Sequence, residues 1–418
     1  MNWLVIVTGF VGVALFAVDL GPFTIFPYRI CLSLLWLLFA MRVLATHSVP
    51  LPNYPTRWSL LFFGFWLVYA VLSLGWAASK GAGVRDVIFL FMGASLVFFA
   101  TCYVRRESDF RMWHRIWIGM LCAFVLLGLW EHVTGQHLPV SGLFGETRAR
   151  FMSRPTGVFF NPNDFATFLA LGIPFGLSML RYGRRMMPRL VGGVVAAAAF
   201  YLIVATGSRA NMLAVLLEVS FLGLFLTRFK GKIGMLMAGG ICASIFVLSA
   251  VGPIHSFFAA VGEELGSIYT QAHQESGSIA IRTNLARNSL LFLHSTAGFG
   301  VGAGNTEHWM AHVAAYDTAG ILNAHNWWLE VLTEYGILVF AGYVALYVGV
   351  IRSLWRRWRS SPDRVHRMIS EALLLSLVGF AVASMSSSSI MAFKPQWLLF
   401  AFAVSFVSYA HSGKVGGA

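Results

Sequence analysis

The stretch NAHNWWLE (residues 323–330) marks the point where a long polar segment gives way to an apolar run. The polar segment begins at residue 252 and separates two runs of roughly 20 apolar residues, the length that crosses a bilayer core as a helix. It gathers Glu, His and Arg side chains that a membrane span would exclude. We therefore expect the chemistry of this protein to lie in this segment, outside the lipid.

The composition of the chain is that of an integral membrane protein. Of its 418 residues, 58% are hydrophobic and 11% are charged, whereas soluble proteins average about 25% charged residues. A membrane β-barrel would need shorter segments of alternating polarity, and the sequence has none. We predict an all-α polytopic membrane protein, with residues 1–418 forming a single membrane domain. The first apolar run lacks a basic leader, so we expect a retained helix rather than a signal peptide.

Apolar runs of spanning length recur along the chain and predict about twelve transmembrane helices. The predicted spans are residues 3–18, 28–45, 58–77, 86–103, 116–133, 164–180, 190–206, 210–227, 234–251, 327–350, 370–387 and 395–410.

The basic residues orient these spans. Most of the 30 Lys and Arg residues fall in alternate connecting segments, which the positive-inside rule assigns to the cytoplasm together with both termini. Two sizeable loops then lie outside: residues 134–163, and residues 252–326, an inserted subdomain between the ninth and tenth spans. Helical spacing from Ser278 to His294 predicts a helix in the larger loop. Because the net charge of +13 is concentrated at span ends, it indicates contact with lipid headgroups and not with nucleic acid.

Three polar motifs precede external helix N-termini in this topology. They contain Asn163 before the sixth span, Ser208 before the eighth and Asn326 before the tenth. The N–H groups and partial positive charge of a helix N-terminus suit a phosphate. The same residue types also cap helices, so capping alone remains an equal interpretation for Asn163 and Ser208.

Arginines outside the membrane are the strongest sign of an anionic ligand. Arg209 occupies a tight external turn between two apolar spans, against the positive-inside bias, and needs an acid or an anionic ligand nearby. Arg282 and Arg287 of the large loop could complete a phosphate clamp with Arg209, since guanidinium groups bind phosphoryl oxygens in pairs. Arg29, near the outer end of the second span, is a further candidate.

His325 is the candidate catalytic base. A helix N-terminus and nearby arginines lower the pKa of a histidine, which then stays neutral and accepts a proton at neutral pH. The alternative is a hydrogen-bonded interfacial histidine beside Trp327 and Trp328. Glu330 could orient His325 or form a structural pair with a buried arginine.

The sequence predicts no metal and no cofactor. The four cysteines fall in predicted spans without metal spacing, and the pair His308 and His312 has no third ligand at a suitable distance in sequence. The alternating glycines from Gly298 to Gly304 do not follow a strand, so we interpret them as a flexible turn and not as a nucleotide loop.

Taken in order, these motifs resemble those of a known family. NPNDFA precedes a mid-chain span, TGSRAN joins the next two, an arginine-bearing loop follows, and HNWWLEVLTEYGIL opens the next span. This arrangement over residues 155–345 is similar to the bacterial O-antigen ligase/polymerase superfamily, whose members transfer glycans from undecaprenyl pyrophosphate at the periplasmic face of the inner membrane.

The resemblance implies roles for particular residues. Arg209 and Arg282 match the arginines that engage the lipid-linked pyrophosphate, and His325 matches the loop histidine that activates an acceptor hydroxyl, without a metal. We expect lipid A-core oligosaccharide as the first choice of acceptor, because the chain has one compact external loop that bears the histidine. Polymerisation of lipid-linked repeat units and transfer to a protein use the same parts, and a lipid-linked-oligosaccharide flippase is the alternative that is not an enzyme.

Overall fold

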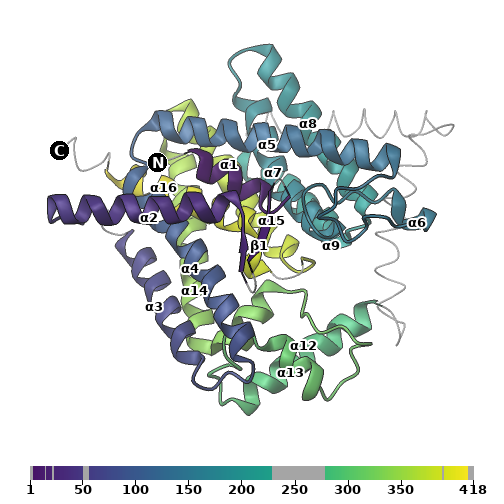
Figure 1. Cartoon of the computed structure of the whole chain (residues 1–418). Coiled ribbons are helices and arrows are strands. Elements are labelled where there is room, and N and C mark those ends of the chain that lie inside the picture. The colour runs from purple at the N-terminus through teal and green to yellow at the C-terminus, as the bar shows by residue number, and fades with distance from the viewer. Residues whose placement is uncertain are drawn as a thin grey trace.

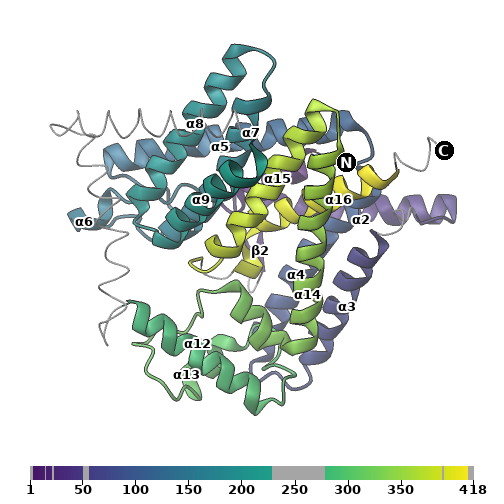
Figure 2. The ribbon, with the colours of Figure 1, turned by 180° about the vertical axis from the view of Figure 1, so that it is seen from behind.

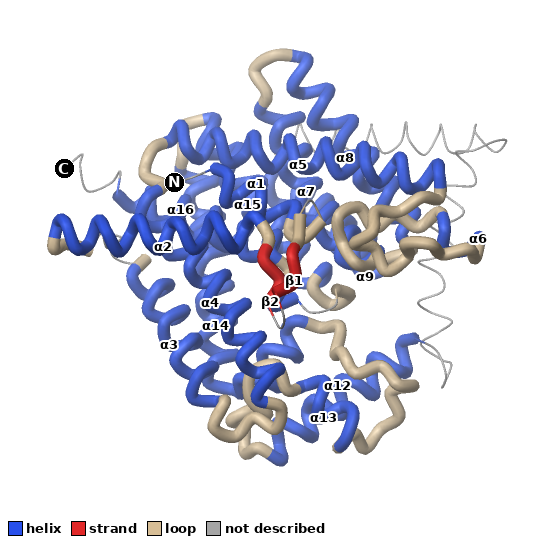
Figure 3. Tube along the Cα trace, in the orientation of Figure 1, coloured by secondary structure: helices blue, strands red, loops and turns tan. Residues whose placement is uncertain are grey.

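The computed structural model describes residues 3–14, 16–20, 23–49, 56–227, 278–387 and 390–412, and these are almost entirely helical (Figures 1 and 3). The elements before residue 228 are α1 (Trp3–Val11), β1 (Val18–Leu20), β2 (Phe23–Ile25), α2 (Pro27–Thr46), α3 (Arg57–Ser73), α4 (Lys80–Tyr103), α5 (Glu107–Thr134), α6 (Ala149–Met152), α7 (Pro162–Tyr182), α8 (Met186–Thr206), α9 (Arg209–Phe221) and a π-helical turn (Leu222–Leu226). The later elements are α12 (Ser278–Ser295), α13 (Thr306–His312), α14 (Trp327–Ser360), α15 (Arg364–Ala383), a 3-10 turn (Ile390–Ala392) and α16 (Lys394–Ser412).

The all-α polytopic membrane class is confirmed. Within the described residues, 8 helices are long and apolar enough to cross a membrane: α2, α4, α5, α7, α8, α9 with its π-helical turn, α14 and α15. A helix satisfies every backbone N–H and C=O group within its own segment, which lipid requires because it offers no hydrogen bonds.

Helices lie at every predicted span except 234–251, which falls outside the described residues. The first prediction is wrong in length. The helix predicted over 3–18 ends at Val11, and Gly12 (φ +61°) turns the chain into the hairpin β1–β2. A helix of 9 residues is about 14 Å long and cannot cross a hydrocarbon core of about 30 Å.

Burial separates central helices from peripheral ones. In α7, 72% of an 18-residue apolar stretch is buried inside the protein, whereas in α2 the corresponding share is 6%. α7 packs against α8 and α15, while α4 packs against α16. Figures 1 and 2 show α12 and α13 grouped below α9 and α15. α12 occupies the helix predicted from Ser278 to His294.

α14 is broken at Gly336, where φ is +74°. A Cβ at this position would meet the carbonyl oxygen of Gly298 at 2.3 Å, so only glycine fits. The glycine segment 298–304 docks on the break: Val301 N–H donates to the Thr333 carbonyl (2.8 Å) and Ile337 N–H to the Gly298 carbonyl (2.9 Å). The flexible turn predicted from its glycines is thus a docked segment.

The close packing of α7 on α8 gives a direct test of this fold. A Cβ on Gly192 would meet the Gly176 carbonyl oxygen at 2.6 Å, whereas one on the adjacent Gly193 would make ordinary contacts with Leu180 at 3.5 Å. Gly192→Val should therefore destabilise the protein by roughly 1–3 kcal/mol, because the helices must separate. Thermal unfolding in detergent, followed by tryptophan fluorescence, measures the loss. Gly193→Val is the matched control, and equal melting temperatures for the two variants would contradict this packing.

Candidate active site

Three arginines from distant parts of the chain line one cavity of about 390 Å³ between α9 and α12. We call it the arginine cavity. Its polar lining residues are Arg154, Asn163, Thr206, Ser208, Arg209, Arg282 and Ser386. The lining includes no carboxylate among the described residues, so the cavity presents cationic and neutral groups to a ligand.

Arg209 reaches the cavity because the turn between α8 and α9 is short and fixed. Gly207 ends α8 in the left-handed region (φ +72°), and the N–H of Ser208 donates to Oγ1 of Thr206 (3.2 Å). α9 then begins at Arg209. The arginine is thus held at a helix N-terminus, where the helix dipole also favours an anion.

A buried amide fastens this turn to its neighbours. Nδ2 of Asn211 lies 2.9 Å from Oγ of Ser208, 2.9 Å from Oγ of Ser386 and 3.3 Å from Oγ1 of Thr167. It therefore joins α9 to α7 and to the turn after α15. The sequence pattern TGSRAN contains this asparagine, but only the structure shows that it is the anchor.

The sequence left open whether Asn163 and Ser208 only cap helices. In the structure neither residue makes a capping side-chain hydrogen bond. The residue that caps α7 is Asn161, whose Oδ1 accepts from the N–H of Asp164 (2.8 Å). Ser208 makes no capping hydrogen bond to α9. Asn163 and Ser208 both line the arginine cavity instead.

The large loop folds back to complete the cavity. Arg282 of α12 lies across from the α8–α9 turn, and burial together with the charge of Arg209 lowers the pKa of its guanidinium. An arginine keeps its charge despite such a shift, so the two like charges repel and a bound anion relieves the repulsion. Arg154, in the loop of residues 134–163, joins them. It was missed because, apart from its place in a loop expected outside the membrane, nothing in the sequence marked it.

His325 lies in the turn before α14 in a strained backbone conformation. Its φ is +47°, which is uncommon for a residue with a side chain, and its N–H donates to Oδ1 of Asn323 (2.7 Å). Burial and the charge of Arg282 lower the pKa of its ring, opposed by a hydrogen bond to the Ser387 backbone and by Glu307. Burial and Arg282 therefore favour the neutral form of the imidazole.

The ring of His325 is connected to α7 through a serine. Its hydrogen bond to the backbone of Ser387 holds the imidazole, while Nδ1 is buried and has no partner among the described residues. Oγ of Ser387 donates to Oδ1 of Asp164, whose Oδ2 accepts from Nδ2 of Asn161 (2.8 Å). Asp164 and Ser387 were missed as positioning residues, although both lie in motifs of polar residues beside predicted spans.

Two predicted arginines do not reach the cavity. Nη1 of Arg29 donates to the carbonyl of Thr24 (2.6 Å), and its guanidinium lies over the ring of Phe26. Arg287 is on the same helix as Arg282, but its guanidinium lies over the ring of Tyr316, 5.5 Å from the ring centre. Neither lines the arginine cavity, so the structure does not bring them together with Arg209 and Arg282.

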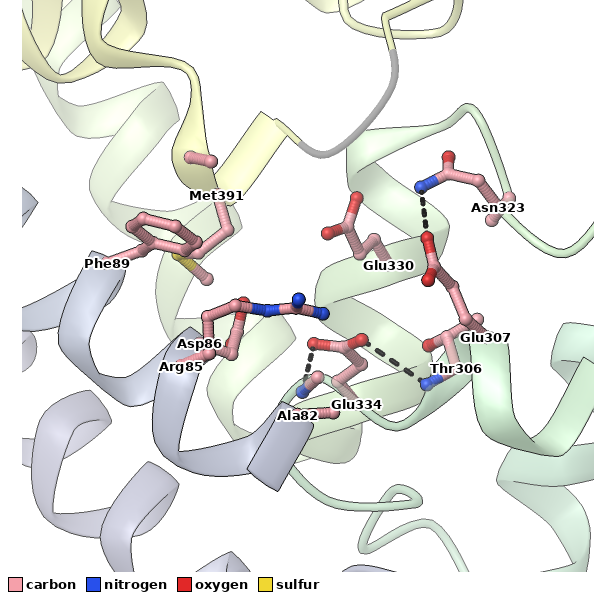
Figure 4. A pocket seen from close by; sticks show the side chains of 13 residues that line it. Ala82, Arg85, Asp86, Phe89, Thr306, Glu307, Asn323, Glu330, Glu334 and Met391 are labelled. Atoms are coloured by element: carbon pink, nitrogen blue, oxygen red, sulfur yellow. Dashed lines mark hydrogen bonds between the residues drawn. The ribbon is translucent and has the colours of Figure 1, made fainter. Parts of the chain in front are cut away.

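The other two predicted supporting residues have separate places. Asn326 caps α14, because its Oδ1 accepts from the N–H groups of Trp328 (3.1 Å) and Leu329 (3.4 Å). Glu330 lines a second cavity (Figure 4). From its position in the sequence we expected Glu330 to lie beside His325. In the structure, the side chain of Glu330 lines the second cavity instead.

Comparisons with known proteins show the family of this chain. Residues 194–344 match the O-Antigen ligase family, a range that includes Arg209, Arg282 and His325. The chain is 31% identical over 410 residues to the teichuronic acid biosynthesis protein TuaE of Bacillus subtilis (strain 168), covering 97% of this chain and 83% of that protein. The chain belongs to the O-antigen ligase family. It is accordingly a multi-pass membrane glycosyltransferase of the O-antigen ligase and polymerase type.

This O-antigen ligase family member also has a distant likeness among solved structures. A chain from a structure titled "Structural coordination of polymerization and crosslinking by a peptidoglycan synthase complex" superposes with a TM-score of 0.44 and 15% identity. The match covers 85% of this chain and 97% of that chain. A likeness at this level carries no functional argument.

The electrostatic surroundings of His325 predict a pH dependence. A base must be neutral, so kcat at saturating substrates should fall as the pH drops through the pKa of His325, which burial and Arg282 hold below the ordinary value of about 6.5. Arg282→Gln removes a repelling charge, raises this pKa and should move the acidic limb to higher pH. Glu307→Gln removes an attracting charge and should move the limb to lower pH. Identical limbs in both variants would contradict a role for His325 as the titrating base.

Proposed function

We propose that this protein transfers a glycan from undecaprenyl pyrophosphate to an acceptor hydroxyl without a metal or cofactor. The observation that carries the proposal is the arginine cavity, where Arg209 and Arg282 meet beside His325. The family assignment supports the reaction class, and the geometry supports the roles of the residues.

The cavity suits a pyrophosphate donor. Arginine guanidinium groups form paired, charge-assisted hydrogen bonds with phosphoryl oxygens, and the N-terminus of α9 adds N–H groups directed at the same space. The cationic lining replaces the neutralising role that a divalent ion plays in other transferases. The undecaprenyl tail would extend from the cavity into the surrounding lipid.

The proposed reaction uses His325 as a general base. The acceptor oxygen attacks the anomeric carbon of the donor sugar while the imidazole takes the hydroxyl proton. The bond between that carbon and the pyrophosphate oxygen breaks, and the electron pair leaves with undecaprenyl pyrophosphate. Arg209, Arg282 and Arg154 stabilise the charge that develops on this leaving group.

The acceptor that we propose first is lipid A-core oligosaccharide, at the periplasmic face of a bacterial inner membrane. The distribution of Lys and Arg supports cytoplasmic termini and an external active site. The similarity to a teichuronic acid biosynthesis protein favours a second candidate, in which the acceptor is a growing lipid-linked polysaccharide and the protein is a polymerase.

Substitutions in reconstituted vesicles test the residue roles. His325→Ala should lower kcat by about 10²–10⁴-fold, the usual contribution of a general base, whereas His294→Ala, exposed on α12, should not. Arg282→Ala should weaken donor binding by about tenfold or more, because hydrogen bonds to charged groups are lost. Arg287→Ala is the matched control on the same helix. Full transfer by His325→Ala, or equal donor affinity in the two arginine variants, would refute the proposal.

The product identifies the acceptor. Purified protein is supplied with undecaprenyl-pyrophosphate glycan, lipid A-core, a lipid-linked repeat unit and an acceptor protein, and the products are analysed by mass spectrometry. Glycosylated lipid A-core indicates a ligase, and longer lipid-linked chains indicate a polymerase. A glycosylated protein would indicate a protein transferase, while movement of unaltered donor across the bilayer would indicate a flippase.

A further inference from the structure

A second cavity, of about 410 Å³, lies between the N-terminal turns of α4 and α14 and the loop that leads into α13 (Figure 4). We call it the carboxylate cavity. Its charged and polar lining residues are Arg85, Asp86, Thr306, Glu307, Asn323, Glu330 and Glu334. Four carboxylates face one arginine here, the reverse of the arginine cavity.

Two of the carboxylates serve the fold. Oε2 of Glu334 accepts from the N–H of Gly304 (2.9 Å) and Oε1 accepts from the N–H of Thr306 (3.4 Å), so Glu334 holds the docked glycine segment. Asp86 accepts from the hydroxyl of Tyr335. These bonds explain why acids are present at the base of the cavity.

The other two carboxylates do not have such a structural task. Oε1 of Glu307 accepts one hydrogen bond, from Nδ2 of Asn323 (3.1 Å). Glu330 accepts none from the described part of the chain, although Figure 4 shows its side chain at the cavity wall. Acceptor oxygens directed into a cavity are suited to ligand groups that donate hydrogen bonds.

A buried hydroxyl points to the same conclusion independently. The side chain of Thr306 lines the cavity, and the residue is only 3% exposed. Its Oγ1 is buried and has no partner among the described residues. Leaving a buried hydroxyl unsatisfied is unfavourable, so this group is suited to pairing with a ligand that enters the cavity.

Residues beside His325 line both cavities, although His325 itself lines neither: its ring binds the backbone of Ser387, which follows Ser386 of the arginine cavity. Asn323 and Ala324 line the carboxylate cavity immediately before His325 in the chain. The imidazole interacts electrostatically with Glu307 of the carboxylate cavity and with Arg282 of the arginine cavity. A base in this position has a donor site on one side and space for an acceptor on the other.

We infer that the carboxylate cavity is the acceptor subsite and that it takes a hydroxyl-rich sugar without a carboxylate. This inference depends on the proposed function, in which the arginine cavity holds the donor. The cavity volume is within the range of sites for small ligands. Sugar hydroxyls pair with Glu330, Glu307 and Thr306, whereas a uronic acid brings its negative charge against the exposed carboxylate of Glu307, in a cavity whose lining arginine, Arg85, interacts with Asp86. Among the described residues, the group with metal-ligand spacing is Glu107, Asp363 and His366, which lies outside this cavity.

Two matched probes test the inference with the full-length protein in vesicles. Decyl β-D-glucopyranoside and decyl β-D-glucuronide share tail and ring and differ by the carboxylate. Each is added to the transfer assay as a competitor of the natural acceptor. The glucoside should compete at a concentration at least about tenfold lower than the glucuronide, because of the charge repulsion. Equal competition, or no competition by either while transfer proceeds, overturns the inference.

Variants connect the discrimination to the cavity. Glu307→Gln should reduce the preference for the glucoside over the glucuronide, because it removes the exposed negative charge, and Thr306→Val should weaken glucoside competition by about tenfold. The KM for the donor should be unchanged in both. Glu146→Gln, on the outer loop where Glu146 pairs with Arg148 (2.7 Å), is the control and should keep the full preference. An unchanged preference in Glu307→Gln, with a normal donor KM, refutes the subsite alone. Unchanged donor affinity in Arg282→Ala together with unchanged kcat in His325→Ala would instead refute the proposed function.

Discussion

The buried amide of Asn211 is the interaction on which the candidate active site depends. The residue is fully buried, and its Nδ2 contacts Ser208, Ser386 and Thr167. Between apolar helices an amide finds no water, so its hydrogen bonds must come from neighbouring helices. Those bonds fix the ends of α7, α9 and α15 relative to one another, and Arg209 is held at this junction. A hydrophobic residue in place of Asn211 would preserve helix packing in general but would leave the turn without this constraint.

The site that results is organised by charge. Like charges at Arg209 and Arg282 are confined in one cavity, and the second arginine also lowers the pKa of His325. The same guanidinium therefore has two effects: it favours an anion in the cavity and keeps the neighbouring imidazole neutral. Asp164 accepts a hydrogen bond from the hydroxyl of Ser387, and the backbone of Ser387 binds the imidazole, so the carboxylate is connected to the ring through this serine.

The break in α14 connects this site to the second cavity. Gly336 allows the segment 298–304 to approach α14 closely, and Glu334 binds that segment through the N–H groups of Gly304 and Thr306. The first turns of α14 carry Glu330 on one wall, while His325 lies in the turn before them. A continuous helix without the docked segment would not form this wall, so the position of the base and the shape of the carboxylate cavity have a common cause.

The sequence by itself determined the membrane class, the positions of nearly all the helices and three of the residues at the centre of the site: Arg209, Arg282 and His325. Hydrophobic runs and unexpected external arginines are local features, and local features can be read along the chain. The tertiary structure decided which of several similar residues enter the cavity. Arg282 lines it while Arg287 stacks on Tyr316, and Arg154 enters although its loop gave little signal. It also shortened the first predicted span and placed Glu330 in the second cavity. These outcomes depend on how each helix is rotated and where it ends. The packing of distant segments sets both, and no local pattern records them.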